Sequence, residues 1–153
     1  MDPKGQSVFF QDIATANAMC SGFASLLGTR TLQSLADVYF RCCDQQPYSY
    51  FHEATFRREL ENSSLPHYLL LAFAATAVRF SSDPCFTGRH EEVMDWYSRM
   101  AWSEIIKQSF SDTQSLDIRT VQAANMLGVV DYVGMLNPSI LSRGPRLLQS
   151  SWP

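Results

Sequence analysis

LPHYLLLAFAATAV, residues 65–78, decides the fold of this 153-residue chain. Its apolar side chains lie on every side of a helix rather than along one stripe. Such a helix is buried on most of its faces and needs other elements around it. Pro66 suits the first turn, where its missing N–H group has no helical acceptor to lose. Because Ser81-Ser82-Asp83-Pro84 stops the pattern, the stretch predicts a helix, buried on most of its faces, over residues 67–80.

Working outward, apolar residues at helical spacing predict four more helices. They cover residues 31–43, 53–60, 90–110 and 117–133. The apolar residues of the last helix include Ile118, Val121, Met126, Leu127 and Val130. No stretch reads clearly as a strand. The predicted fold class is therefore all-α, a helical array that looks like a partial domain of about five helices.

The chain divides into three parts by pattern. Residues 1–30 form a weakly patterned N-terminal segment, and residues 31–136 hold the predicted helices. Residues 137–153 form an unpatterned tail with breakers at Asn137-Pro138, Gly144-Pro145 and Trp152-Pro153.

Composition and charge exclude several classes of protein. Twelve Lys and Arg against fifteen Asp and Glu leave a net charge of −3, which does not suit a strongly basic nucleic-acid binder. The adjacent pair Arg57-Arg58 fits a solvated helix face better than a DNA-backbone contact. The apolar run 68–78 is well short of the ~20 residues that span a bilayer. Four scattered cysteines and no apolar leader predict a reducing, intracellular compartment.

The sequence carries none of the common catalytic or metal-binding motifs. His52-Glu53 and His90-Glu91 each lack the second histidine of a zinc-protease helix, because Phe56 and Met94 stand there. No Cys-x2-Cys pair, nucleophile elbow or glycine-rich phosphate loop occurs. We therefore expect no enzyme activity, and no metal or other cofactor bound to this chain.

A cluster of aromatic residues surrounds the link between the predicted helices 31–43 and 53–60. Two interpretations stay open: a small-molecule pocket, or packing between two helices. The residues concerned are Tyr48, Tyr50, Phe51, His52 and Phe56.

Four ordered segments resemble the regulatory middle domain of fungal zinc-cluster (binuclear six-cysteine) transcription factors. They are LADVYFRCCDQQPYSYFHEATFRREL (35–60), LPHYLLLAFAATAVRFSS (65–82), YSRMAWSEI (97–105) and LDIRTVQAANMLGVVDY (116–132). The resemblance covers roughly residues 31–134 and corresponds to the N-terminal half of that domain. The family's zinc-cluster DNA-binding module is absent here, and four cysteines could not supply it.

The resemblance implies a transcription-regulator fragment that acts through protein–protein contacts in the nucleus. Zinc is expected only in the absent module, and this chain is not expected to bind DNA or a membrane itself. A truncated or naturally short form would leave the helix over residues 67–80 partly uncovered, which predicts exposed apolar surface and self-association or marginal stability. The alternative is a small-molecule-sensing helical domain with its aromatic pocket around Tyr48–Phe56.

Overall fold

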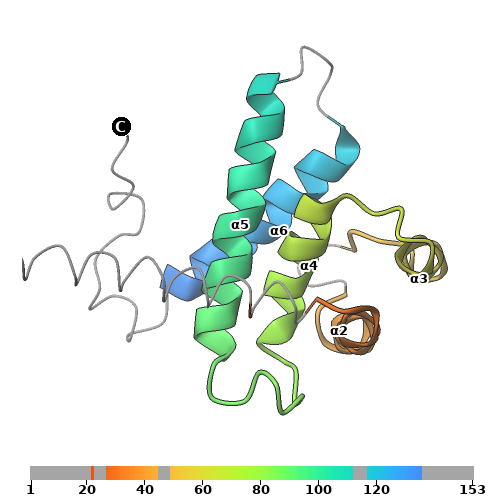
Figure 1. Cartoon of the computed structure of the whole chain (residues 1–153), viewed down its shortest axis with the longest axis vertical. Coiled ribbons are helices and arrows are strands. Elements are labelled where there is room, and N and C mark those ends of the chain that lie inside the picture. The colour runs from red at the N-terminus through yellow and green to blue at the C-terminus, as the bar shows by residue number, and fades with distance from the viewer. Residues whose placement is uncertain (1–21, 23–26, 45–48, 112–116, 136–153) are drawn as a thin grey trace, which may run out of the picture.

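A computed structural model describes residues 22, 27–44, 49–111 and 117–135 of the chain (Figure 1). These residues form five helices and, within those ranges, no strand. The helices are α2 (Thr29–Cys42), α3 (Glu53–Glu61), α4 (His67–Val78), α5 (His90–Ser111) and α6 (Ile118–Met135). The all-α fold class is thus confirmed.

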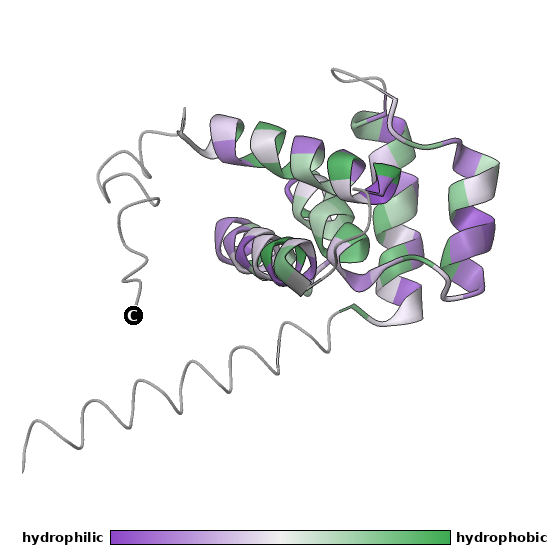
Figure 2. Cartoon of the chain, turned by 90° about the horizontal axis from the view of Figure 1, so that it is seen from above, coloured by the Kyte–Doolittle hydropathy of each residue, from purple (hydrophilic) through white to green (hydrophobic). Residues whose placement is uncertain are grey.

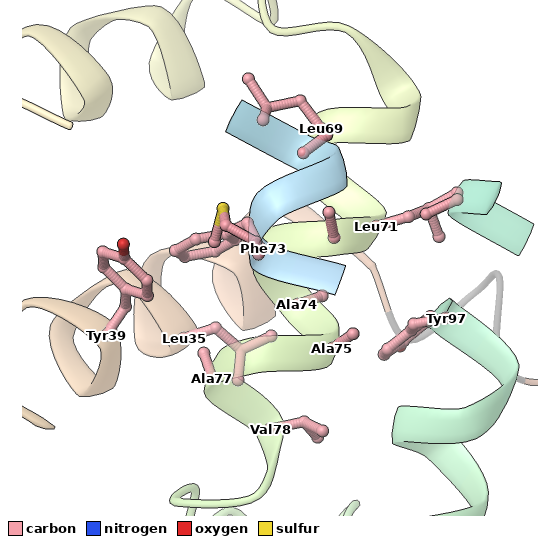
Figure 3. Close-up of a cluster of buried hydrophobic side chains, with 14 of the residues drawn as sticks. Leu35, Tyr39, Leu69, Leu71, Phe73, Ala74, Ala75, Ala77, Val78 and Tyr97 are labelled. Atoms are coloured by element: carbon pink, nitrogen blue, oxygen red, sulfur yellow. The ribbon is translucent and has the colours of Figure 1, made fainter. Parts of the chain in front are cut away.

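Helix α4 lies at the centre of the array. It packs against α2 on one side and against α5 and α6 on the other. Figure 3 shows Leu35 and Tyr39 of α2 on one side of α4 and Tyr97 of α5 on the opposite side. Its four alanines are small enough for the neighbouring helices to approach closely, and all four are fully buried. Seen from above, the outer helices alternate between hydrophilic and hydrophobic residues, whereas the middle of the molecule is mostly hydrophobic (Figure 2).

The ends of the helices follow from local chemistry. Pro66 is the N-cap of α4, and its carbonyl accepts the backbone N–H groups of Leu69 and Leu70 at 3.0 and 3.1 Å. The Asp117 carboxylate precedes α6 and accepts the N–H of Arg119 at 3.3 Å, which satisfies one of the free donors of the first turn. Gly88, in the turn before α5, has a φ of +76°, a conformation that glycine adopts without steric cost.

The predicted helices agree with the observed ones to within two residues at each end. The main difference is α4, which ends at Val78, so that Arg79 and Phe80 lie in a turn and Phe80 is exposed. The predicted tail, 137–153, lies outside the described residues, as does most of segment 1–30. The proposed limits of the three parts stay predictions.

The expectation that α4 would lack cover is wrong. Nine of its twelve residues are buried, because α2, α5 and α6 already surround it. The polar Thr76 fits into this helix because its hydroxyl donates to the Ala72 carbonyl at 3.0 Å. Exposed apolar side chains do occur among the described residues, but they lie on α5, on α6 and, at Phe80, in the turn after α4.

Candidate interaction surface

The aromatic cluster predicted from the sequence lies between α2, α3 and α4. The Phe56 ring is 4.7 Å from that of Phe51 and 4.8 Å from that of Phe73 on α4, measured between centroids. Tyr39 of α2 adds contacts at 5.8 Å to Phe51 and 5.2 Å to Phe73. At these separations the rings attract one another beyond the effect of burial alone. The rings of Phe51 and Phe56 therefore fill space between helices.

The other members of the predicted cluster are placed differently. His52 is exposed at the N-cap of α3, where its Nδ1 lies 3.3 Å from the Thr55 hydroxyl. Tyr50 packs against the core, and its carbonyl accepts a hydrogen bond from the Gln122 amide at 2.7 Å. Tyr48 lies outside the described residues. A ligand-binding role for the cluster remains a prediction.

One hollow in the described part of the chain lies apart from these rings. Its volume is about 80 Å³, whereas small-molecule pockets usually measure roughly 300–1,000 Å³. It could hold a few water molecules but not a drug-sized ligand. Its lining consists of Thr29, Leu32, Leu60, Ser63, Leu65 and Leu70.

The described cysteines and histidines do not assemble into a metal-binding group with Asp or Glu in the ranges that the structure covers. Burial raises the pKa of the Cys43 thiol to about 11, and the neighbouring Cys42 adds to the effect. Burial also raises the pKa of the Cys85 thiol to about 11, together with a hydrogen bond to Asp83. Both thiols are therefore protonated at neutral pH, the opposite of an activated nucleophile.

The raised pKa values of the Cys43 and Cys85 thiols predict how the free energy of unfolding depends on pH in the alkaline range. Above about pH 9 they ionise in the unfolded chain but stay protonated in the folded one until about pH 11. The unfolded state then binds fewer protons, so the free energy of unfolding should fall as the pH rises through this range. The buried hydroxyls of Tyr39 and Tyr97, whose pKa values burial also raises, continue the trend above pH 10.

Urea unfolding at pH 8, 9, 10 and 11, at constant ionic strength, measures this effect. The urea midpoint should decrease with each step, and the Cys43→Ala/Cys85→Ala variant should lose less between pH 9 and 10 than the parent chain. A midpoint that stays constant to pH 11 would contradict the burial of these groups.

Arg57, the first residue of the adjacent pair Arg57-Arg58, forms ion pairs with two carboxylates. Its guanidinium is 2.8 Å from Asp37 of α2 and 2.8 Å from Glu53 of its own helix. The pKa of Arg57 is raised, chiefly by the hydrogen bond that it donates to Glu53 and, in addition, by its hydrogen bond and ion pair with Asp37. Two carboxylates beside one guanidinium oppose the approach of phosphate, which fits the prediction of a solvated helix face.

Helix α6 is joined to the array by polar contacts as well as by its buried side chains. Arg119 pairs with Glu59 of α3 at 2.8 Å, and the Thr120 hydroxyl lies 3.3 Å from the buried Tyr68 hydroxyl of α4. Near the other end, Asp131 accepts hydrogen bonds from Ser98 at 3.2 Å and from the Trp102 indole at 3.0 Å, both on α5. These contacts fix which side of α6 faces inward.

The opposite side of α6 is exposed and carries no charge. Its residues recur at i, i+3, i+7, i+10 and i+14, the spacing of one continuous helical face. Figure 1 shows α6 crossing behind α4 and α5, so its far side has none of the described helices against it. We call this surface the α6 outer face; it consists of Ile118, Val121, Asn125, Gly128 and Tyr132.

The sequence analysis listed Ile118 and Val121 together with Met126, Leu127 and Val130 as apolar residues of this helix, without assigning them to an inner or an outer side. Met126, Leu127 and Val130 are buried, but Ile118 is 67% exposed and Val121 is 42% exposed. Tyr132, at 64% exposed, was not singled out. The sequence does contain a signal for this face. A helix at the surface of a globular protein needs one apolar side to pack on the core, and α6 has apolar residues on two sides.

Apolar side chains are also exposed at the end of α5. Phe110 is 86% exposed and Ile106 is 45% exposed. Among the described helices, none is long and apolar enough to cross a bilayer. Exposed apolar side chains in one place mark contacts with other macromolecules more often than isolated ones do. The exposed apolar side chains of α5 and α6 are therefore a candidate contact surface among the described residues.

The chain is similar in sequence to fungal transcriptional regulators. It is 44% identical over 48 residues to the transcriptional regulatory protein C1327.01c of Schizosaccharomyces pombe. This match covers 31% of this chain. It is 33% identical over 96 residues to the S. pombe transcriptional regulatory protein C530.11c. It is 28% identical over 100 residues to the Zn(2)-C6 fungal-type transcription factor FTF2 of Fusarium oxysporum f. sp. lycopersici. Each of the latter two matches covers 63% of this chain.

The matched stretches are small parts of the relatives, amounting to 5%, 11% and 9% of their lengths in the same order. No protein-family profile and no solved structure matches the chain. Over part of its length, the chain is a homologue of fungal transcriptional regulators that include Zn(2)-C6 transcription factors.

Proposed function

We propose that this chain regulates transcription in the nucleus through protein–protein contacts, without binding DNA, a metal or another cofactor itself. Its homologues are fungal transcriptional regulators, which supports the process. The observation that carries the mechanism is the uncharged, exposed α6 outer face. Its apolar side chains leave water when another protein covers them, and this burial favours binding.

The same physical argument disfavours direct DNA binding as the mechanism. The net charge is −3, and Arg57 already lies beside two carboxylates. Affinity for a phosphate backbone depends on several unengaged cations acting together. Similarity to the regulatory middle domain of the zinc-cluster family, which the sequence suggests, agrees with a regulatory part that relies on other modules for DNA contact.

A tethered reporter assay tests the proposal. The full chain is fused to a heterologous DNA-binding domain that does not activate transcription, and a reporter with the matching site is measured in yeast. The fusion should change reporter output at least about threefold, in either direction, relative to the DNA-binding domain alone.

Variants connect this response to the surface. Ile118→Asp/Val121→Asp should return output to that of the DNA-binding domain alone, because it places two charges on the α6 outer face. Both substitutions lie in the first turns of α6, where carboxylates favour the helix dipole, so folding should be preserved. Gln108→Asp, an exposed position on α5, is the matched control and should leave the response intact. A nuclear, normally expressed fusion without any effect on the reporter would contradict the proposal.

A further inference from the structure

The turn that follows α4 presents a short segment with four exposed side chains of different chemistry. Residues 79–84 read Arg-Phe-Ser-Ser-Asp-Pro, and they belong to the loop that joins α4 to α5 (Figure 1). Arg79, Phe80, Ser82 and Pro84 are exposed, whereas Ser81 between them is buried. At 44% exposed, Phe80 is an aromatic side chain that the core of this chain leaves available.

Ser82 carries the hydroxyl of this segment that a modifying enzyme can reach. Its side chain is exposed, and within the described residues neither its hydroxyl nor its backbone takes part in a hydrogen bond. The neighbouring Ser81 differs, because its hydroxyl accepts the N–H of Asp83 at 3.2 Å and its carbonyl lies 2.8 Å from Nε2 of His90. Modification of the Ser82 hydroxyl therefore breaks none of the hydrogen bonds that hold the turn.

Arg79 lies three residues before Ser82 and forms no ion pair with a carboxylate among the described residues. Its guanidinium lies over the ring of Phe80, 4.6 Å from the ring centroid. Of the described serines and threonines, Ser82 alone follows a Lys or Arg at this spacing. Protein kinases select their substrates partly by charge pattern, and carboxylates in the groove of a kinase complement such a cation. Ser82 therefore combines accessibility with a charge that favours its modification.

We propose that Ser82 is a phosphorylation site and that the phosphorylated segment 79–84 binds a 14-3-3 protein, a class that recognises phosphoserine with a cluster of arginines. A kinase transfers the γ-phosphoryl group of ATP to Oγ of Ser82. The bond from Oγ to the γ-phosphorus forms, the bond from that phosphorus to the β–γ bridging oxygen breaks, ADP leaves, and the hydroxyl proton passes to a carboxylate of the kinase. The inference goes beyond the proposed function, because it uses no residue of the α6 outer face.

The side chains around Ser82 fit such a partner. A phosphoserine carries a charge of about −1.5 to −2 and three acceptor oxygens, which pair with guanidinium groups in charge-assisted hydrogen bonds. This partner class favours an arginine three residues before the phosphoserine, an aromatic residue or serine next, and a proline two residues after it. Arg79, Phe80 and Pro84 stand at these positions. Pro84 also disfavours a helical conformation at Asp83, so the chain leaves the phosphate without continuing as a helix.

Docking requires the segment to extend, and the phosphate itself promotes this change. The end of α4 is closed by the N–H of Ser81, which donates to the Val78 carbonyl at 3.0 Å. Hydrogen bonds at the end of a helix open more readily than those at its middle. A phosphate on Ser82 lies next to Asp83 in the chain and beyond the negative end of the α4 dipole, and both repel it. Phosphorylation therefore weakens the turn that an unmodified Ser82 leaves undisturbed.

Binding to a purified yeast 14-3-3 protein tests the inference. The full chain is produced with phosphoserine incorporated at position 82 during translation, and fluorescence anisotropy measures the Kd, which should be on the order of 1 µM. The unmodified chain should bind at least about 100-fold more weakly, because the arginine cluster of the partner then has no phosphate to hold. In the phosphorylated chain, Arg79→Ala and Pro84→Ala should each weaken binding about tenfold. Both residues are exposed, so the variants should fold, as circular dichroism will verify.

The full chain with phosphoserine at position 63 instead is the matched control. Ser63 is exposed in the loop before α4 but has Leu60 three residues before it, so this form should bind no better than the unmodified chain. The modification itself is tested on the full chain purified from yeast with phosphatases inhibited. Mass spectrometry should find phosphate on Ser82, and Arg79→Ala should remove it.

Three results would overturn the inference. The first is a chain from yeast without phosphate on Ser82. The second is a chain with phosphoserine at position 82 that binds the partner no better than the unmodified chain. The third is equal binding of the chains phosphorylated at positions 82 and 63, which would show attraction to charge without recognition of the segment.

Discussion

Leu127→Asp is expected to lower the free energy of unfolding by about 4 kcal/mol or more, whereas Val121→Asp on the same helix should lower it by less than about 1 kcal/mol. Leu127 is fully buried on the inner side of α6, and a carboxylate placed there would lose its hydration without gaining a partner. Val121 lies on the α6 outer face, where a carboxylate stays in water. The stability of a small domain is about 5–15 kcal/mol, so the first change removes a large fraction of it.

Urea unfolding of both variants, followed by circular dichroism at 222 nm, measures this contrast. The two substitutions introduce the same residue into one helix, so the net charge is matched between them, and the difference in helix propensity between Leu and Val is less than about 0.7 kcal/mol. Equal losses of stability would mean that α6 has no fixed inner side, and the assignment of its outer face would fail.

Phe73→Ala should lower the free energy of unfolding by about 3–5 kcal/mol, the range for a buried aromatic side chain. The Phe73 ring is fully buried at the middle of α4 and contacts both Tyr39 and Phe56. Its removal leaves a cavity among three helices, and the fixed positions of α2 and α3 limit how far the cavity can close. The loss should appear in the urea midpoint with little change in the slope of the transition.

Phe110→Ala is the control for this experiment, because it deletes the same atoms from a side chain that is 86% exposed. Its effect should stay within about 0.5 kcal/mol. A small effect at Phe73 would show that the aromatic cluster is loosely packed, and the interpretation of the cluster as a ligand pocket would gain support.

The sequence predicted the helices well because strong breakers stand between them. Pro66, Pro84 and Gly88 mark the ends of α4 and the start of α5 without reference to the rest of the fold. The central place of α4 followed from its apolar residues on every side, which only surrounding helices can bury. Local chemistry was enough for both predictions.

The direction in which α6 faces could not be predicted in the same way. Ile118 and Val121 on one side are as apolar as Met126 and Leu127 on the other, so periodicity leaves both orientations open. The contacts that decide between them join residues far apart in the chain, such as Arg119 with Glu59 and Trp102 with Asp131. The aromatic cluster shows the same limit of prediction from local pattern. The sequence indicates that its rings lie close together, but it does not indicate that Phe73 of α4 packs against Phe56.

Two claims about the molecule are central: neighbouring helices of this chain cover α4 on most of its sides, and the α6 outer face is left as a surface available to a partner. Amide hydrogen exchange on the full chain, read residue by residue, tests the first claim most directly. The amides of α4 should exchange slowest of all and only through global unfolding, because α2, α5 and α6 enclose that helix. Exchange in α4 as fast as at the exposed ends of α5 and α6 would contradict the claim.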